Sequence, residues 1–362
     1  MDLDNDLALW LRLSLIPGLG DRSLRRLLLS FGSPQQIFSA SRAALAKFVP
    51  AETASIIRDG GAGGENLDVV ASWLEDPANH VVTLADAEYP QALLETPDPP
   101  LLLYVKGRTE LLNHRSLAIV GSRSASPQGI ANAESFAKAL SDAGLTIISG
   151  LALGIDAVAH RGGLAGAASS VAVVGTGLDI VYPARNRVLA HRLAVEGAIF
   201  SEFPLGTPAL GANFPRRNRL ISGMARGCLV IEAALQSGSL ITARLANEQG
   251  KDVFAIPGSI HSPLSKGCHV LIKQGAKLVE TAQDILEELR MPVSAARPPA
   301  AMAEADSQTQ ILLDQLGFYP CDIDTLCERC GFHSDVVLSL LTRLEIDGRV
   351  AALPGGRFQR IV

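Results

Sequence analysis

Short apolar runs alternate with helix-like stretches through the middle of the chain, from about residue 110 to residue 290. Each run ends at small residues, and a helical pattern follows it. The runs are Leu117–Val120, Leu145–Ser149, Val171–Val174, Ala198–Ser201, Cys228–Ile231, Val253–Ile256 and Lys277–Val279. Such runs predict strands buried on both faces, in a doubly wound, mostly parallel Rossmann-like α/β sheet. Because ligands of these sheets bind beyond the carboxyl ends of the strands, the following loops are the candidate functional segments.

The patterns on either side predict two smaller units. Apolar residues at helical spacing predict a helical domain over residues 1–80, in which the turn Pro17–Gly20 joins two helices. That turn is either a packing loop or, as in helix-hairpin-helix modules, a source of backbone N–H groups for a phosphate. Residues 291–308, rich in Ala and Pro, predict a linker. Residues 309–362 predict three helices and a hairpin, a winged helix that binds either DNA or protein. The expected central domain covers residues 81–290.

Charge and cysteine content narrow the class of protein. The net charge is −5, so nucleic-acid binding needs a local patch, and the segment Val181–Gly275 carries eleven Lys/Arg against five Asp/Glu, or +6. The acidic start Met1–Asp6 does not resemble a secretory signal, and the sequence has no uninterrupted apolar run long enough to span a bilayer. Five cysteines do not indicate a disulfide framework. We therefore expect a cytoplasmic protein without a membrane partner.

The loop after the first strand of the central domain is a candidate phosphate site. Gly121 permits a tight turn, Ser122 adds a hydroxyl, and Arg123 adds a planar guanidinium, with the positive end of a helix expected directly afterwards. The alternative is an ordinary strand-to-helix turn with a surface arginine. The loop matches neither the Gly-x-Gly-x-x-Gly fingerprint nor a P-loop, so no nucleotide cofactor is expected.

A second candidate is the run from Asn213 to Gly223. Phe214 precedes three arginines at positions 216, 217 and 219. Arginines neutralise phosphates and a ring stacks on a base, so the run is typical of a single-strand site. In the alternative interpretation, Phe214 packs at the start of a helix and an arginine pairs with an acid.

Other groups favour structural roles. Asp156 and His160 are four residues apart and could form an acid–base pair, but a helix cap and a hydrogen-bonded histidine are the stronger interpretation. Three cysteines and a histidine near the C-terminus could bind zinc; we favour an apolar packing role, because one Cys-x-x-Cys stands alone. These residues are Cys321, Cys327, Cys330 and His333.

Seven spaced motifs resemble the DNA-processing protein A family (DprA, also called Smf). They are Gly121–Arg123, Ser149–His160, Gly175–Pro183, Phe214–Gly223, Glu232–Ala243, Val253–Gly258 and Gly267–Ala276. The resemblance implies a non-catalytic homodimer that binds single-stranded DNA, protects it and loads the RecA recombinase during natural transformation. The positions that match the family's DNA contacts are Gly121, Ser122, Arg123, Phe214, Arg217 and Asn218. The matching dimer patch is His269, Ile272 and Leu278. Ala184 and Gly211 stand where some relatives carry lysines.

Two other classes of function remain open. A nucleotide hydrolase of the lysine-decarboxylase-like group shares a similar core, although its Pro-Gly-Gly-x-Gly-Thr run is missing from this sequence. Glu232 and Asp156 are the acid–base candidates that such an enzyme would need. A transcription factor that reads duplex DNA through the winged helix is the third possibility.

Overall fold

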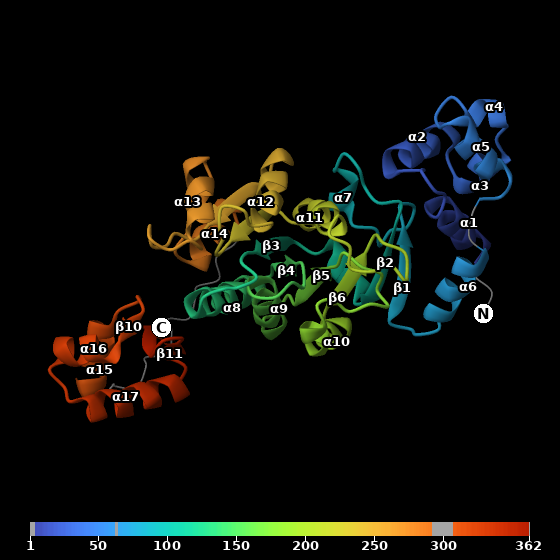
Figure 1. Ribbon diagram of the computed structural model, residues 1–362. Coiled ribbons are helices and arrows are strands. Elements are labelled where there is room, and N and C mark those ends of the chain that lie inside the picture. The colour runs from blue at the N-terminus through green and yellow to red at the C-terminus, as the bar shows by residue number, and fades with distance from the viewer. Residues whose placement is uncertain (1–3, 62–63, 292–306, 362) are drawn as a thin grey trace.

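The central domain is a nine-stranded sheet with helices on both faces (Figure 1). The computed structural model describes residues 4–61, 64–291 and 307–361. The strands are β1 (Asn79–Thr83), β2 (Leu102–Gly107), β3 (Ser116–Val120), β4 (Thr146–Ser149), β5 (Ser170–Val173), β6 (Ala198–Ser201), β7 (Gly227–Val230), β8 (Asp252–Ala255) and β9 (Lys277–Leu278). Their order is β1-β2-β6-β5-β4-β3-β7-β8-β9, and the seven strands from β6 to β9 are parallel. The predicted doubly wound fold is confirmed.

The strands and helices of this domain follow from one alternating pattern. The helical elements are α7 (Gln91–Leu94), η1 (Thr109–Asn113), α8 (Pro127–Asp142), α9 (Ile155–Ala165), η2 (Ala184–Asn186), α10 (Arg187–Glu196), α11 (Asn213–Met224), α12 (Ser239–Glu248), α13 (Lys266–Lys273) and α14 (Ala282–Glu288). Residues of α11, α12 and α13 share one buried cluster with the sheet, and those of α8, α9 and α14 share another. The sheet therefore separates two apolar cores, as Figure 1 shows by the helices above and below it.

Two strands lie outside the region for which the sequence predicts them. β1 and β2 pair antiparallel with each other, and β2 pairs antiparallel with β6. They extend the parallel sheet at the edge nearest the N-terminal helices. Their pairing needs no crossover helix, so the strand–helix alternation does not reveal them.

The N-terminal helical unit shares its core with the sheet. It contains α1 (Asn5–Ser14), α2 (Asp21–Phe31), α3 (Pro34–Ser39), α4 (Arg42–Leu45), α5 (Ala51–Arg58) and α6 (Gly64–Trp73). Its buried cluster includes Leu101, Leu102 and Tyr104, and the ring of Tyr104 meets that of Trp73 edge to face at 6.0 Å. Within the turn Pro17–Gly20, Leu19 is buried in this cluster, and Gly18–Gly20 line a hollow together with Leu101, Glu202 and Arg216.

The C-terminal unit is the predicted winged helix with a core of its own. It contains α15 (Ser307–Leu316), β10 (Cys321–Asp322), α16 (Ile323–Cys330), α17 (Ser334–Ile346), β11 (Val350–Leu353) and β12 (Arg357–Arg360). Cys321, Cys327 and Cys330 are free thiols packed in its apolar cluster. Among the described residues, no cluster of three or more His, Cys, Asp or Glu side chains could hold a metal. The predicted linker lies almost entirely outside the described residues.

Candidate nucleic-acid interface

A groove of about 670 Å³ opens at the point where the strand order of the sheet reverses. The chain runs outward from β3 through β4 to β6 and then returns to β7 on the other side of β3. Loops after β3 and β7 therefore diverge and leave a crevice at the carboxyl ends of the strands. The groove is lined by the turn after β3, the start of α11 and the loop before α12. All six predicted contact positions line it, namely Gly121, Ser122, Arg123, Phe214, Arg217 and Asn218.

The start of α9 holds the turn after β3 in a position in which Arg123 faces solvent. Ile155 N, at the start of α9, donates to Ser122 O at 3.1 Å, and Ser122 Oγ accepts from Ser124 N at 3.1 Å. Gly154 has φ +74°, and a Cβ there would lie 2.2 Å from Ser122 O. Only glycine permits this close approach of α9 to the turn. Ser122 is consequently buried, while Arg123 is exposed.

Three side chains stack at the mouth of the groove. The guanidinium carbon of Arg123 lies 5.7 Å from the ring centroid of Phe214, and the ring centroid of Tyr182 lies 5.6 Å from that of Phe214 at an interplanar angle of 37°. Phe214 is half-buried and packs closely on Gly175, whereas Tyr182 is 46% exposed. The result is a cation beside one aromatic ring, with a second ring next to the first, an arrangement that suits a phosphate next to unpaired bases. Tyr182 was not among the predicted site residues; its position before a proline in the loop after β5 is the signal that marks it.

Arg217 forms the floor of the groove and does not project from it. The side chain is only 4% exposed, and Nη1 donates to Gly150 O at 2.7 Å and to Val173 O. Its Nε has no hydrogen-bond partner. Burial lowers the pKa of Arg217 to about 10, a shift that the carboxylate of Asp156 opposes, so Arg217 is charged at neutral pH. It gives the groove a fixed positive charge beneath the surface.

Of the three arginines of α11, Arg217 lines the groove and the other two do not. Arg216 pairs with Asp21 at 3.2 Å and with Glu202 at 3.1 Å, and Arg219 pairs with the same two carboxylates. Burial raises the pKa of Glu202, and the two guanidiniums counter that shift. Arg216 and Arg219 therefore fasten the helical unit to the central domain, because Asp21 opens α2. Asn218, the remaining polar residue here, reaches Gly238 O at 3.5 Å across the groove.

The expected anion site at the start of α8 is also corrected. The helix begins at Pro127, four residues after Arg123, with Ser126 as its cap. Glu232, from the loop after β7, accepts from Ser126 N at 2.9 Å and from Ser126 Oγ at 2.5 Å. A Cβ on Gly129 would collide with this carboxylate at 2.5 Å. The chain's own carboxylate thus occupies the positive end of α8, where a phosphate was expected.

The acid–base candidates are engaged inside the protein. His160 is buried: Leu151 N donates to its Nε2 at 3.3 Å, and its Nδ1 donates to Ser170 Oγ at 2.7 Å. Burial lowers the pKa of His160 to about 3, so the ring is neutral. Asp156 Oδ2 accepts from Gly150 N at 3.2 Å, and burial raises the pKa of this carboxyl. The histidine is hydrogen-bonded as the structural interpretation expects, but Asp156 does not cap α9, whose N-cap is Gly154 without a side-chain hydrogen bond. Glu232 is committed to α8.

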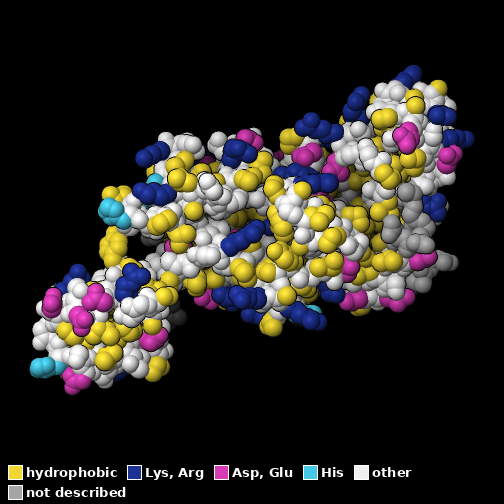
Figure 2. Space-filling model, viewed as in Figure 1, with side chains coloured by type: hydrophobic (Ala, Val, Ile, Leu, Met, Phe, Trp, Pro, Cys, Tyr) yellow, Lys and Arg dark blue, Asp and Glu magenta, His cyan; other side chains and the backbone are white. Residues whose placement is uncertain are grey.

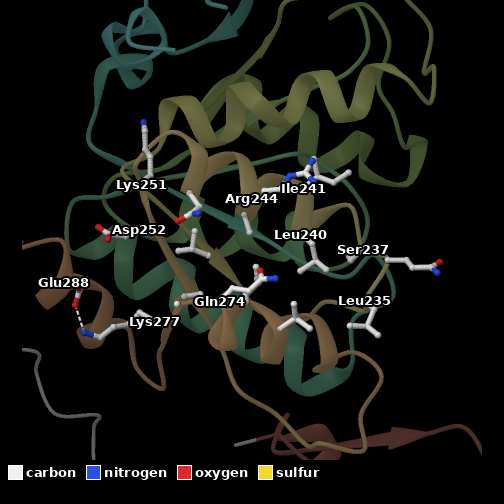
Figure 3. A pocket seen from close by; sticks show the side chains of 18 residues that line it. Leu235, Ser237, Leu240, Ile241, Arg244, Lys251, Asp252, Gln274, Lys277 and Glu288 are labelled. Atoms are coloured by element: carbon white, nitrogen blue, oxygen red, sulfur yellow. Dashed lines mark hydrogen bonds and ion pairs between the residues drawn. The ribbon is translucent and has the colours of Figure 1, made fainter. Parts of the chain in front are cut away.

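The predicted dimer patch borders a second cavity of about 560 Å³, between α12 and α13. Figure 3 shows Leu235, Leu240 and Ile241 on one side of it and the ion pair of Lys277 with Glu288 at the other end. Leu278 follows on the edge strand and is 45% exposed. Ile272 packs partly against the core, and His269 Nε2 lies 3.0 Å from Gly258 O. Leu278 is thus the most accessible residue of the patch.

The fold and the groove define a doubly wound α/β protein that presents a guanidinium and aromatic rings at its switch point. The family model of DNA recombination-mediator protein A matches residues 80–290, and that of the DprA winged helix domain matches residues 296–356. The chain belongs to the DNA recombination-mediator protein A family.

Individual relatives agree with this assignment. The protein Smf of Escherichia coli is 44% identical over 292 residues, covering 78% of each chain. The structure of DNA processing protein A from Streptococcus pneumoniae covers 80% of this chain and 99% of its own, at 37% identity and a TM-score of 0.68. A Helicobacter pylori DNA processing protein A, solved to describe its single-stranded DNA binding mode, covers 58% of this chain and 96% of its own, at 30% identity and a TM-score of 0.53. No helix of the described segments is long and apolar enough to cross a membrane.

Proposed function

We propose that this chain binds single-stranded DNA in the groove at the switch point, without catalysing a reaction on it. The observation that carries the proposal is the stack of Arg123, Phe214 and Tyr182 at the mouth of a groove with a buried arginine in its floor. A guanidinium binds a phosphate with paired N–H donors, and aromatic faces accept unstacked bases of any sequence. Bases in a duplex are already stacked and paired, so the arrangement favours an unpaired strand.

The wider role rests on the family. The relatives are named as DNA processing proteins, and one is described with its single-stranded DNA binding mode. By this likeness we propose that the protein acts in DNA processing during natural transformation, protects the incoming strand and loads RecA recombinase on it. We also propose that two copies meet through the patch of His269, Ile272 and Leu278. The internal commitments of Asp156, His160 and Glu232 support a binding role over a hydrolase.

Binding of a fluorescent oligothymidine, followed by anisotropy, tests the groove. Phe214→Ala should weaken binding by about 1–3 kcal/mol, the usual contribution of one stacked base. Arg123→Ala should cost about 1.5–3 kcal/mol, as expected for hydrogen bonds to a charged group.

The matched control is Lys47→Ala, which removes an exposed cation from the helical unit. It should leave the affinity unchanged. Wild-type affinity in both Arg123→Ala and Phe214→Ala would remove the groove from DNA binding and overturn the proposed function.

A further inference from the structure

Exposed basic side chains gather on α9 and α10, the helices that cover one face of the sheet next to the groove. Arg161 lies on α9, Arg185 lies in η2, and Arg187 and His191 lie on the first turns of α10; all four side chains are exposed. Within the described parts of the chain, Arg161, Arg185 and Arg187 form no ion pair. Figure 2 shows Lys and Arg side chains over α9 and α10, below the centre of the molecule. The groove accounts for none of these four residues.

This surface is continuous with the groove. Asn186, directly before α10, donates from Nδ2 to Leu151 O at 2.8 Å and to Ala152 O at 3.1 Å. Ala152 lines the groove, so these bonds fix the start of α10 against the groove wall. The loop before η2 carries Tyr182, whose ring contacts Phe214. A strand that passes Phe214 and Tyr182 therefore arrives at Arg185 and Arg187.

Arg161 extends the same surface along α9. Ala157 and Leu164 both pack in the cluster that α9 shares with α10. Arg161 lies four residues after Ala157 and three before Leu164, which places it on the outer surface of α9, next to the residues that pack against α10. Its side chain is exposed there.

The carboxylates of Glu196 and Asp179 are each engaged by groups other than these three arginines. Glu196 on α10 is held by Arg192 at 2.8 Å, in an i,i+4 pair. Asp179, in the loop after β5, accepts from Gly206 N at 2.9 Å. Three arginines therefore remain available to a polyanion, and their spread over two helices suits an extended backbone more than a compact anion.

We propose that a single strand held in the groove continues past Tyr182 and over the seam of α9 and α10, where Arg161, Arg185 and Arg187 bind its phosphates. This path rests on the proposed function, because it begins in the groove. It makes the affinity depend on oligonucleotide length. Each phosphate neutralised on a single strand contributes about 0.7 to the slope of log affinity against log salt, so the three arginines account for about 2 units of that slope.

The test compares a short oligothymidine of about six nucleotides, which fills only the groove, with a long one of about 25, within the range over which strand-binding proteins extend. Wild-type protein should bind the long strand more tightly and with the steeper salt slope. In the full-length double variant Arg161→Glu/Arg187→Glu, the long-strand affinity should fall about tenfold or more, and its slope by about 1.4, while the short-strand affinity stays within about twofold. Glutamate is favourable in the first turn of a helix, so position 187 tolerates the change.

The control is Arg42→Glu/Lys47→Glu, which makes the same change of net charge on the helical unit, where both residues are exposed. It should bind both strands as wild type does. An unchanged long-strand affinity in Arg161→Glu/Arg187→Glu, or an equal loss for both lengths, would overturn the path while leaving the groove intact. Failure of the wild type to bind either strand would overturn the proposed function, and the path with it.

Discussion

The buried histidine of α9 shows how a residue with catalytic chemistry serves the fold. The ring of His160 joins the loop after β4 to Ser170 on β5, and it does so as a neutral acceptor and donor. Protonation would convert Nε2 into a donor that faces another donor, Leu151 N. Burial, together with the nearby charge of Arg217, lowers the pKa of His160 to about 3.

Stability should consequently fall as the pH falls below the ordinary histidine pKa of about 6.5. Between pH 6.5 and about 3, His160 is protonated in the unfolded chain but stays neutral in the folded protein. The free energy of unfolding therefore decreases as the pH falls through this range. Between pH 7 and pH 5 this amounts to about 2 kcal/mol. Urea unfolding at the two pH values measures it, and His160→Gln should lose less on acidification than the wild type. An equal loss in both proteins would contradict the assignment.

The arginines of α11 mark the limit of prediction at the scale of single residues. The motifs locate Gly121–Arg123 and Phe214–Asn218, and the sheet brings them to one groove because each follows a strand end. The sequence could not tell which arginine faces the groove. Successive helical residues are about 100° apart, so Arg217 points away from Arg216 and Arg219, which are three residues apart and share a face. Two of them meet carboxylates from distant segments, Asp21 and Glu202, and that pairing depends on tertiary structure.

At the scale of elements, the start of α9 sets the position of the turn that carries Arg123. Gly154→Ala places a Cβ 2.2 Å from Ser122 O at a positive φ, so α9 or the turn must move. We expect Gly154→Ala to lower both the thermal unfolding midpoint and the oligothymidine affinity, the latter about tenfold or more, because Arg123 leaves its place beside Phe214.

Gly144→Ala provides the matched control for that substitution. Gly144 also has a positive φ, +92°, but a Cβ there meets nothing within 4 Å. This variant should lose about 1 kcal/mol of stability through backbone strain and keep its affinity. Equal losses of affinity in the two variants would show that backbone strain alone, and not the displaced turn, weakens binding.

The elements of the parallel sheet follow from its regular alternation, and the remaining elements do not. Apolar runs such as Val171–Val174 match β5 within one residue. β1 and β2 have no crossover helix, so the local pattern does not mark them, whereas the run Lys277–Val279 does predict the two-residue β9. The sequence also does not predict that Glu232 binds the start of α8, because the two are more than a hundred residues apart in the chain.

At the scale of the whole molecule, the two end units differ in how they depend on the sheet. The helical unit buries Leu101, Leu102 and Tyr104 of the central domain, whereas the winged helix closes a cluster made of its own residues. Deletion of residues 1–77 should therefore destabilise the central domain, since each side chain thus uncovered loses about 1.5–3 kcal/mol of burial. Deletion of residues 292–362 is the control and should leave the midpoint of the central domain nearly unchanged. Thermal unfolding of the two truncated proteins measures this, and equal midpoints would contradict it.

The carboxylate of Glu232 at the start of α8 has a consequence for selectivity. In nucleotide-binding relatives of this architecture, the first helix after the leading strand receives the ligand's phosphates. Here the carboxylate of Glu232 occupies that position, so a mononucleotide phosphate would meet a negative charge at the start of α8. ATP and other small phosphorylated metabolites should therefore compete poorly for the groove. A polymer is favoured, because it binds through many weak contacts along its length.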